Sequence, residues 1–385
     1  MAKLTTEELK RYSRHLVLEE FGLEAQMRLK EAKVLVVGAG GLGSPALLYL
    51  TAAGVGTLGI IDPDVIDLSN LQRQVLFNVS DIGAKKALTA EKKLKQLNPL
   101  VSITSYPQKI VSGNAIQLIR NYDLVVDGTD NFATRYLLND ACVLLDKPLI
   151  YGSILKFEGQ LAVFNFLKKD GNRSSNYRDL FPEPPLPESV PNCEQAGVIG
   201  VLPGIIGSLQ ANEAIKILTG IGEVLSDKLL IFDSLTLDQT LINIPNRNSR
   251  DSIKSLIDYE DFCGISRDKN KSLVTNPSNT MKEVTVQELK KMKESGEDFQ
   301  LIDVREPHEY DICNLEGELI PMSEIPSNVE KISKDKKVVI HCRSGKRSGD
   351  MLLWLEKNHG LTNLYNLKGG VLAWAKEIDP EMPTY

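Results

Sequence analysis

The sequence has no long hydrophobic run, since none of its apolar segments approaches the roughly 20 residues that a helix needs to cross a bilayer. Its opening stretch, MAKLTTEELKRYSRH, also lacks the apolar core of a secretory signal. We therefore expect a cytoplasmic protein with no membrane partner.

Paired cysteines are missing as well, because no two of the five cysteines have the spacing of a CxxC motif. An odd and scattered set is typical of a reducing compartment and argues against a disulfide framework. Any cysteine chemistry should therefore come from single residues. The five are Cys142, Cys193, Cys263, Cys313 and Cys342.

The chain also lacks a strong excess of charge. Its formal net charge is −6, acidic and basic residues are interleaved, and 42% of the residues are hydrophobic. This balance predicts no nucleic acid and no anionic membrane as a partner. A length of 385 residues predicts roughly two or three domains.

What the sequence does contain is a glycine cluster, VLVVGAGGLGS, at Val34–Ser44. Apolar, strand-forming residues run into Gly38, Gly40 and Gly43, which have GxGxxG spacing, and a helix pattern follows over Pro45–Ala53. A strand, tight turn and helix of this kind bring backbone N–H groups and a helix N-terminus close to a phosphate. The motif predicts a nucleotide site without identifying the nucleotide.

Charged residues follow this motif where nucleotides are usually bound. Asp62 ends a predicted strand over Thr57–Ile61, at the distance from the glycines where a carboxylate hydrogen-bonds a ribose. Lys85 and Lys86 open a predicted helix over Gly83–Leu97, at the end where the helix dipole disfavours cations. The residues alone leave open whether one lysine faces an anion or both are solvated.

Two carboxylates lie in the segment DGTDN. Asp127 and Asp130 follow a predicted strand over Tyr122–Val126, and the carboxyl edge of an open α/β sheet is where ligands bind. Either carboxylate could hold Mg²⁺. The alternative for Asp130 is that it caps the helix that follows, to about Leu145.

The order of the elements predicts an α/β fold with a doubly wound, mostly parallel, Rossmann-like sheet, extended by antiparallel strands. Helices are expected over Thr6–Glu19 and Leu23–Glu31, before the glycine motif. Gly159–Leu167 should be an antiparallel strand, Lys168–Pro191 a long loop, and Lys228–Phe232 the last strand of this domain.

A polar run then separates two domains. We expect residues 1–264 to form the first domain, 265–280 to be a linker, and 281–385 to form a smaller α/β domain. In the smaller domain we expect strands at Phe299–Val304, Lys337–His341 and Asn363–Tyr365, and helices at Lys346–Asn358 and Gly370–Ile378.

Cys342 lies between one of these strands and the helix that follows, in HCRSGKRSG. Backbone N–H groups, a helix N-terminus and nearby cations all stabilise a thiolate or an anionic sulfur adduct, so a nucleophile is favoured over a structural cysteine. Phosphate-monoester hydrolysis and sulfur transfer both use such a loop. Protein phosphatases have an arginine six positions after the cysteine, where Ser348 stands here, and Arg347 is only five positions away. The shorter loop favours a persulfide.

These segments, in this order and spacing, resemble a known family. VLVVGAGGLGS, IIDPDVIDLSNLQRQ, GAKKA and DGTDNFATR are similar to the adenylating enzymes related to ubiquitin-activating proteins, specifically the ThiF-like molybdopterin-synthase adenylyltransferases. DVREPHEYDICNLEG, HCRSGKRSG and LKGGVLAWAKEIDP resemble a rhodanese domain. The fusion resembles enzymes that charge small ubiquitin-like sulfur-carrier proteins. It implies ATP-dependent adenylation of a carrier's C-terminal Gly-Gly, then sulfur transfer from a rhodanese persulfide to give a thiocarboxylate.

The resemblance also implies roles for particular residues of the adenylation domain. ATP would lie at Gly41, with Lys86, three positions after Gly83, as the phosphate lysine and Asp130 as the Mg²⁺ ligand. Arg14 would reach the ATP of the other subunit in a homodimer. The implied nucleotide-binding residues are Gly38, Gly40, Gly41, Gly43, Asp62 on the ribose, Asn70 and Arg73 near the phosphates, Lys86, Asp130 and Asn131.

In the rhodanese domain the resemblance implies that Cys342 carries the persulfide, supplied by a donor such as a cysteine desulfurase. Cys193 matches a cysteine that in some relatives forms a transient acyl or disulfide link. The persulfide loop would comprise Arg343, Ser344, Gly345, Lys346 and Arg347.

The sequence departs from the family pattern at a metal site. Many relatives hold structural zinc with two CxxC pairs, but here Asn176 and Asp179 stand at the positions of the first pair, and the second region, IPNRNSRDS, has no cysteine. We therefore expect ATP and Mg²⁺ but no zinc.

Two other functions fit parts of the sequence. An NAD(P)-dependent oxidoreductase with an accessory rhodanese-like domain agrees with the glycine motif and Asp62, but has no need of Arg73, Lys86 or DGTDN. A non-enzymatic dimeric scaffold is disfavoured by the intact CRSGKR loop.

Overall fold

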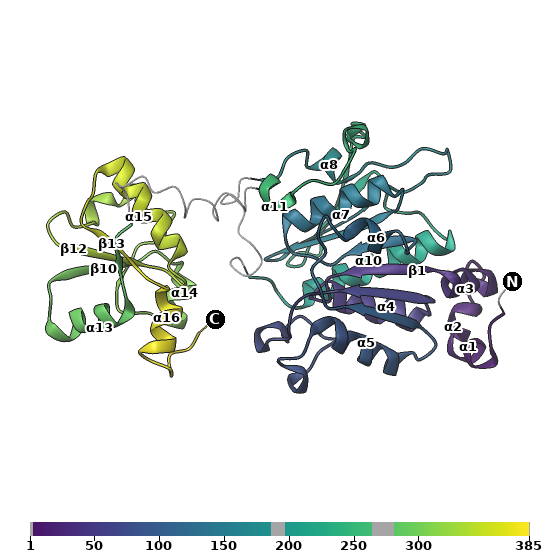
Figure 1. The fold of residues 1–385 in the computed structure, drawn as a ribbon, viewed down its shortest axis with the longest axis horizontal. Coiled ribbons are helices and arrows are strands. Elements are labelled where there is room, and N and C mark those ends of the chain that lie inside the picture. Colours follow the sequence, from purple (N-terminus) through teal and green to yellow (C-terminus); the bar gives the residue numbers. More distant parts are fainter. Residues whose placement is uncertain (1–2, 186–196, 264–280, 385) are drawn as a thin grey trace. The chain divides into compact units, whose positions relative to one another are not determined.

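A computed structural model describes residues 3–185, 197–263 and 281–384 of the protein. Contacts divide the chain into two compact units, Met1–Leu273 and Val274–Tyr385 (Figure 1). Cys193 and the predicted linker at 265–280 lie outside the described residues. Within the described ranges, no helix combines the length and the apolar character that a bilayer crossing requires.

The larger unit is built on one sheet, which has eight strands among the described residues, in the order β3-β2-β1-β4-β5-β6-β7-β8. Its first five strands in this order are parallel and the rest are antiparallel, as the sequence predicts. The strands are β1 (Lys33–Val37), β2 (Thr57–Ile61), β3 (Ser102–Tyr106), β4 (Leu124–Asp127), β5 (Leu149–Leu155), β6 (Glu158–Phe164), β7 (Lys228–Asp233) and β8 (Gln239–Asn243).

Helices cover both faces of this sheet because the central strands are apolar on both faces. In β1, Val34 and Val36 pack into one core and Leu35 and Val37 into another, as the two-residue period of a strand requires. The helices of the larger unit are α1 (Thr6–Arg11), α2 (Ser13–Leu16), α3 (Gly22–Glu31), α4 (Gly43–Ala53), α5 (Lys86–Leu97), α6 (Ala115–Ile119), α7 (Phe132–Leu144), α8 (Tyr177–Leu180), α10 (Val201–Thr219) and α11 (Tyr259–Phe262).

Two helices, one at the N-terminus and one after Gly83, have other bounds than the sequence predicts. The helix predicted over Thr6–Glu19 ends at Arg11 and is followed by the short α2. Tyr12 lies at this break, where it is buried and its hydroxyl accepts a 2.9 Å hydrogen bond from Asn98 Nδ2. The predicted helix at Gly83 begins instead at Lys86, because Gly83 has a φ of +85°.

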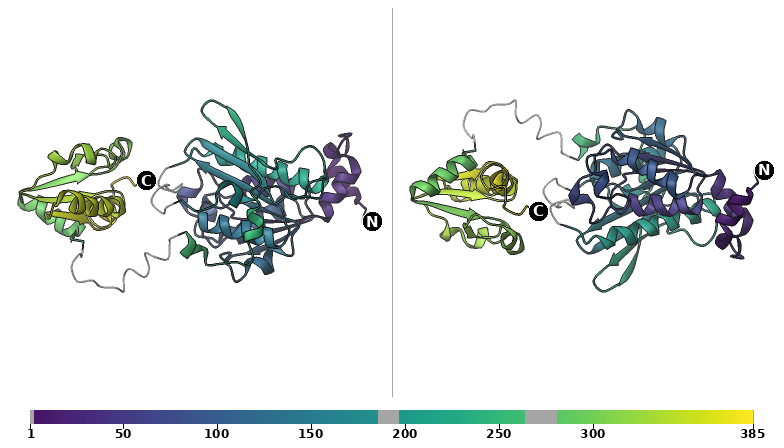
Figure 2. Two further views of the ribbon diagram at one scale, coloured as in Figure 1. Left: turned by 90° about the horizontal axis from the view of Figure 1, so that it is seen from above. Right: turned by 90° about the horizontal axis from the view of Figure 1, so that it is seen from below.

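Two predictions in the second half of the unit are also corrected. Lys228–Phe232 is not the last strand, since β8 pairs with β7 to form a hairpin that extends from the sheet (Figure 2). The predicted loop over Lys168–Pro191 contains helix α8, and Ser175 and Asn176 are buried before it.

The smaller unit has a five-stranded parallel sheet among its described residues, in the order β11-β10-β12-β13-β9. Its predicted strands and helices are confirmed to within a few residues, and Lys337–His341 has the predicted bounds. Cores lie on both faces of the sheet. The elements are β9 (Glu283–Val284), α13 (Val286–Ser295), β10 (Phe299–Asp303), α14 (Pro307–Ile312), β11 (Glu318–Leu319), β12 (Lys337–His341), α15 (Lys346–His359), β13 (Leu364–Leu367) and α16 (Gly370–Glu377).

Candidate active sites

The first candidate site is a cavity of about 380 Å³ at the carboxyl edge of the parallel strands of the larger unit. Most of the expected nucleotide-binding residues line it, although they are spread over almost a hundred positions of the chain. Those that line it are Gly38, Gly40, Gly41, Asp62, Arg73, Lys86, Asp130 and Asn131.

The glycine loop between β1 and α4 is packed too closely for side chains at two positions. Gly38 has a φ of +92°, and a Cβ there would lie 2.6 Å from the Gly128 carbonyl oxygen. A Cβ at Gly43 would lie 1.8 Å from the Gly38 carbonyl oxygen. The turn therefore lies against the loop after β4, and α4 begins directly after Leu42, which lines the cavity. In the first turn of α4 the Ser44 N–H donates to the Gly40 carbonyl oxygen at 2.9 Å.

Asp62 lies at the end of β2 and is almost fully buried. Its Oδ2 accepts a 2.8 Å hydrogen bond from the Ala39 N–H, and its Oδ1 accepts one of 2.9 Å from the Asp64 N–H. Burial raises the pKa of Asp62, while these two N–H groups oppose the rise. The carboxylate thus ties the strand end to the glycine loop and still borders the cavity.

The two adjacent lysines at the start of α5 have different surroundings. Lys86 is buried, lines the cavity, and its Nζ lies 3.1 Å from Asp64 Oδ2. Lys85 is exposed and its Nζ donates to the Pro63 carbonyl oxygen at 2.8 Å. Of the pair, Lys86 is therefore the cation available to a bound anion.

The sequence left open whether Asp130 faces a ligand or caps the helix that follows it. Asn131 is the N-cap of α7, and its Oδ1 accepts a 2.9 Å hydrogen bond from the Thr134 N–H. The alternative that Asp130 caps this helix is therefore wrong. Asp130 is exposed at the cavity, and within the described residues its carboxylate has no hydrogen bond or ion pair.

Arg135 is a cavity residue that the sequence analysis missed. It is buried on α7, its guanidinium lies 5.7 Å and 5.4 Å from the ring centroids of Phe132 and Tyr151, and its Nη2 donates to the Thr129 carbonyl oxygen at 3.3 Å. Its position four residues after Asn131 could have indicated a place on the same helix face. Gln74 and Lys109 also line the cavity, and the sequence had suggested no role for either residue.

Three expected site residues, Gly43, Asn70 and Arg14, do not line this cavity. Asn70 Oδ1 accepts a hydrogen bond from the Asp67 N–H at 3.1 Å, within a capping box. Arg14 lies on α2, near the N-terminus, and is exposed. A role for Arg14 would need the cavity of another subunit.

The second candidate site is the loop after β12 in the smaller unit. Cys342 is fully buried there, and its Sγ accepts a 3.2 Å hydrogen bond from the Gly345 N–H. The N-terminus of α16 holds the loop, because the Val371 and Leu372 N–H groups each donate at 3.0 Å to the Cys342 and Arg343 carbonyl oxygens, respectively. The loop thus directs a backbone donor at the sulfur.

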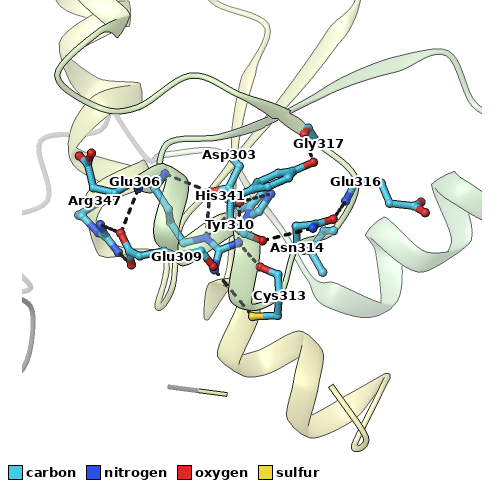
Figure 3. A network of polar contacts seen from close by, with 12 residues as sticks. Asp303, Glu306, Glu309, Tyr310, Cys313, Asn314, Glu316, Gly317, His341 and Arg347 are labelled. Atoms are coloured by element: carbon cyan, nitrogen blue, oxygen red, sulfur yellow. Dashed lines mark hydrogen bonds and ion pairs between the residues drawn. The ribbon is translucent and has the colours of Figure 1, made fainter. Parts of the chain in front are cut away.

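The cations of this loop differ in how far they are neutralised. Arg347 donates two hydrogen bonds to the carboxylate of Glu309, at 2.7 Å and 2.6 Å (Figure 3). Lys346 is exposed and Arg343 is partly buried. The arginine that closes the loop is therefore paired with a carboxylate.

His341 lies directly before Cys342 and is fully buried. Its Nε2 lies 3.7 Å from Asp303 Oδ2 (Figure 3). Asp303 is also paired with the buried Arg305. Burial lowers the pKa of His341 to about 4, against the smaller opposing effect of Asp303. The imidazole is therefore neutral near pH 7.

The two segments where the family resemblance implies a zinc site in other members are joined here by hydrogen bonds to a carboxylate. Asp179 is buried, and its Oδ1 accepts from the Arg247 and Ser249 N–H groups at 3.0 Å and 3.2 Å. Its Oδ2 accepts from the N–H and the Nδ2 of Asn176, both at 2.9 Å. Asn176 Nδ2 also donates to Ser249 Oγ at 2.7 Å. We call this group, Asn176, Asp179, Arg247 and Ser249, the carboxylate clasp.

No group of three or more histidine, cysteine, aspartate or glutamate side chains suited to a metal ion occurs in the part of the chain that the structure describes. The carboxylate clasp joins the segment around α8 to the segment at 247–249 through hydrogen bonds among its own residues.

Comparison with known proteins identifies both units. The ThiF family matches residues 12–253 and the rhodanese-like domain matches residues 285–377. A probable adenylyltransferase/sulfurtransferase MoeZ of Mycobacterium tuberculosis is 46% identical over 385 residues, covering 99% of this chain and 96% of its own length. The adenylyltransferase and sulfurtransferase MOCS3 of Aedes aegypti is 42% identical, covering 100% and 90%.

Other relatives match the larger unit alone. A sulfur carrier protein adenylyltransferase of Thermus thermophilus is 51% identical over 268 residues, covering 68% of this chain and 98% of its own length. The crystal structure of E. coli MccB with MccA-N7isoASN has a TM-score of 0.55 at 22% identity, covering 63% of this chain and 73% of that one, and so shares the fold. These relatives do not support the oxidoreductase alternative.

Proposed function

The chain belongs to the ThiF family and ends in a rhodanese-like domain, so it is an adenylyltransferase and sulfurtransferase, and we propose that its substrate is the C-terminal glycine of a small ubiquitin-like sulfur-carrier protein. The carboxylate would attack the α-phosphate of ATP to give an acyl-adenylate, and sulfur from Cys342 would convert it to a thiocarboxylate. We assign the first reaction to residues 1–264 and the second to 281–385.

The observation that carries the adenylation proposal is the convergence on one cavity of a glycine loop, the N-terminus of α4 and two cations, Arg73 and Lys86. Two anions must meet for adenylation, and fixed positive charge offsets their repulsion and stabilises the transition state. The residues present suit a nucleoside triphosphate: Asp62 would accept a hydrogen bond from the ribose and Lys86 would contact the phosphates.

Asp130 is the proposed Mg²⁺ ligand, since it borders the cavity with an exposed carboxylate. Bound Mg²⁺ would neutralise phosphate charge. Asn131, as the cap of α7, would fix the direction of the loop that presents Asp130. We propose no zinc site, because the carboxylate clasp joins the two segments that zinc holds in relatives.

We further propose a homodimer in which Arg14 of each subunit reaches the nucleotide of the other. This role accounts for an exposed arginine that lies outside its own subunit's cavity. We also propose that the protein acts in the cytoplasm and that its sulfur donor is an enzyme such as a cysteine desulfurase.

For sulfur transfer, the support is the buried sulfur of Cys342 in a loop that directs an N–H group toward it. The outer sulfur of the Cys342 persulfide would attack the acyl carbon, and AMP would leave. A thiolate, with Cys193 as the candidate, would then attack the Cys342 sulfur, releasing the thiocarboxylate and leaving a disulfide for an external thiol to reduce.

Pyrophosphate exchange and thiocarboxylate formation separate the two reactions. We expect Asp130→Ala to lose carrier-dependent pyrophosphate exchange, whereas Cys342→Ala should retain it, and both variants should fail to make thiocarboxylate. Intact mass spectrometry of candidate carriers incubated with ATP and a sulfur donor would identify the carrier. Full exchange activity in Asp130→Ala would refute the site assignment.

A further inference from the structure

A buried amide lies behind the Cys342 loop and contacts two of its residues. Asn366, on β13, is almost fully buried, and its Nδ2 donates to the Gly345 carbonyl oxygen at 3.0 Å. On its other side, Asn366 Oδ1 lies 2.7 Å from the hydroxyl oxygen of Ser348, which is fully buried at the start of α15. Neither residue has a role in the reaction proposed above.

The orientation of the Asn366 amide is fixed by its neighbours. The Gly345 carbonyl oxygen can only accept, so the nitrogen of the amide must face it. The amide oxygen must then face Ser348, and this oxygen also can only accept. The single hydroxyl proton of Ser348 is therefore donated to Asn366.

The direction of the Ser348 hydroxyl proton determines how Ser348 can interact with the sulfur of Cys342. Ser348 Oγ lies 3.4 Å from Cys342 Sγ, and with its proton directed at Asn366 it presents a lone pair to the sulfur. A neutral S–H can donate to that lone pair, whereas a thiolate cannot. Among the described residues, the Gly345 N–H is then the one hydrogen-bond donor to the sulfur.

We propose that Asn366 is a positioning residue for sulfur transfer: it holds the Ser348 proton away from Cys342 and so favours the neutral thiol over the thiolate. To donate to a thiolate, Ser348 must turn its proton away from Asn366, leaving a buried amide oxygen unpaired. This inference rests on the proposed role of Cys342 as the sulfur-carrying nucleophile.

The charged groups around the loop stay the same when Asn366 is changed. Arg343, Lys346 and the Arg347–Glu309 pair belong to the loop and to α14, and His341 with Asp303 lies at the ends of β12 and β10. A change in Cys342 ionisation on substitution of Asn366 would therefore report on the hydroxyl proton.

The test is a pH titration of thiolate absorbance on the full chain, taken as the difference from the same protein with Cys342→Ser. Asn366→Leu frees the Ser348 proton, and we expect the midpoint to fall by about one pH unit, since a hydrogen bond to a charged group is gained. In the double variant Asn366→Leu/Ser348→Ala this fall should disappear. A fall that persists without Ser348, or no fall at all, would overturn the proposal.

Ser348→Ala alone provides a test that does not disturb Asn366. Because the hydroxyl proton is already directed at the amide, we expect its midpoint to stay within about 0.3 pH unit of the wild type. A rise of about one unit would mean that Ser348 already donates to the sulfur, which contradicts the proposal.

Thiosulfate loading separates this inference from the proposed function. The Cys342 thiolate would attack the outer sulfur of thiosulfate, forming Cys342–S–S⁻ and releasing sulfite, and intact mass would record the added sulfur atom. Near pH 7, Asn366→Leu should load several-fold faster than the wild type. Absence of loading in every variant, with the midpoint shift intact, would refute the sulfurtransferase role of Cys342 and leave only the effect of Asn366 on Cys342 ionisation.

Discussion

Adjacent lysines differ in function when only one of them faces a ligand. Lys86 is buried at the cavity and Lys85 is exposed and bonded to a carbonyl oxygen. We expect Lys86→Met to reduce the rate of pyrophosphate exchange by about 10² to 10³, as expected for loss of a charge that stabilises the transition state. Lys85→Met is the matched control and should remain within about threefold of the wild type. Equal losses in the two variants would contradict the assignment.

A second effect at the scale of one residue comes from His341. Because burial lowers the pKa of His341 to about 4, the unfolded chain binds a proton between about pH 6.5 and 4 that the folded chain does not. Stability is therefore present above this range and is lost as the pH falls. From pH 7 to pH 5 the free energy of unfolding should fall by about 2 kcal/mol from this group.

Tryptophan fluorescence can follow this loss in the intact protein, because both tryptophans, Trp354 and Trp374, lie in the smaller unit. Urea unfolding at pH 7 and pH 5 should show the decrease in the wild type and a smaller decrease in His341→Gln. His359→Gln, at an exposed position, should keep the wild-type pH dependence. A full pH dependence in His341→Gln would show that another group causes it.

At the scale of elements, the carboxylate clasp connects α8 and the segment at 247–249. Four N–H donors converge on the buried Asp179 carboxylate. Asp179→Asn would place an NH₂ group against two of these donors and should destabilise the larger unit by about 2 to 3 kcal/mol. Asp170→Asn, in an exposed position of the same segment, is the control.

Calorimetry of the full chain measures this effect, and the transition that ATP raises identifies the larger unit. We expect a chelator to leave the melting temperature of the wild type unchanged, since hydrogen bonds hold the clasp. A decrease with chelator, restored by zinc, would show that a metal stabilises this unit.

Elements with strong apolar patterns could be predicted from the sequence, and exposed ones could not. β12 begins at Lys337, ends at His341 and is apolar between them, and it was predicted with the observed bounds. β8 was missed because all five of its residues are exposed, so no alternation marks it. The helix α13 was also missed, although Thr285 and Glu288 form a capping box that could have indicated its start.

The candidate sites, too, could be predicted from the sequence only in part. Glycine spacing and strand ends predict which backbone segments meet at the sheet edge, so Asp62 and Asp130 could be expected there, and both line the cavity. The choice of Lys86 over Lys85 came from the family resemblance. Contacts between side chains from separate elements carry no such signal. Arg135 between two rings and Asn366 behind the Cys342 loop could be recognised only once those elements had been placed.

At the scale of the whole molecule, the homodimer proposal can be tested by mixing two inactive variants. If Arg14 acts on the nucleotide of the other subunit, Arg14→Ala and Asp130→Ala should each abolish pyrophosphate exchange when expressed alone. A mixed dimer would contain one complete site, with Asp130 from one chain and Arg14 from the other. Random exchange of equal amounts makes half of the dimers mixed, so about a quarter of the wild-type sites should be active.

Activity after subunit exchange should therefore rise from background to about a quarter of the wild-type rate. Mixing Asp130→Ala with Lys86→Met is the control, because both residues line the cavity of the same chain. Each site in that mixed dimer carries one defect, so no activity should return. If Arg14 instead served its own subunit, its mixture would also stay inactive, and the cavity described here would be complete within one chain.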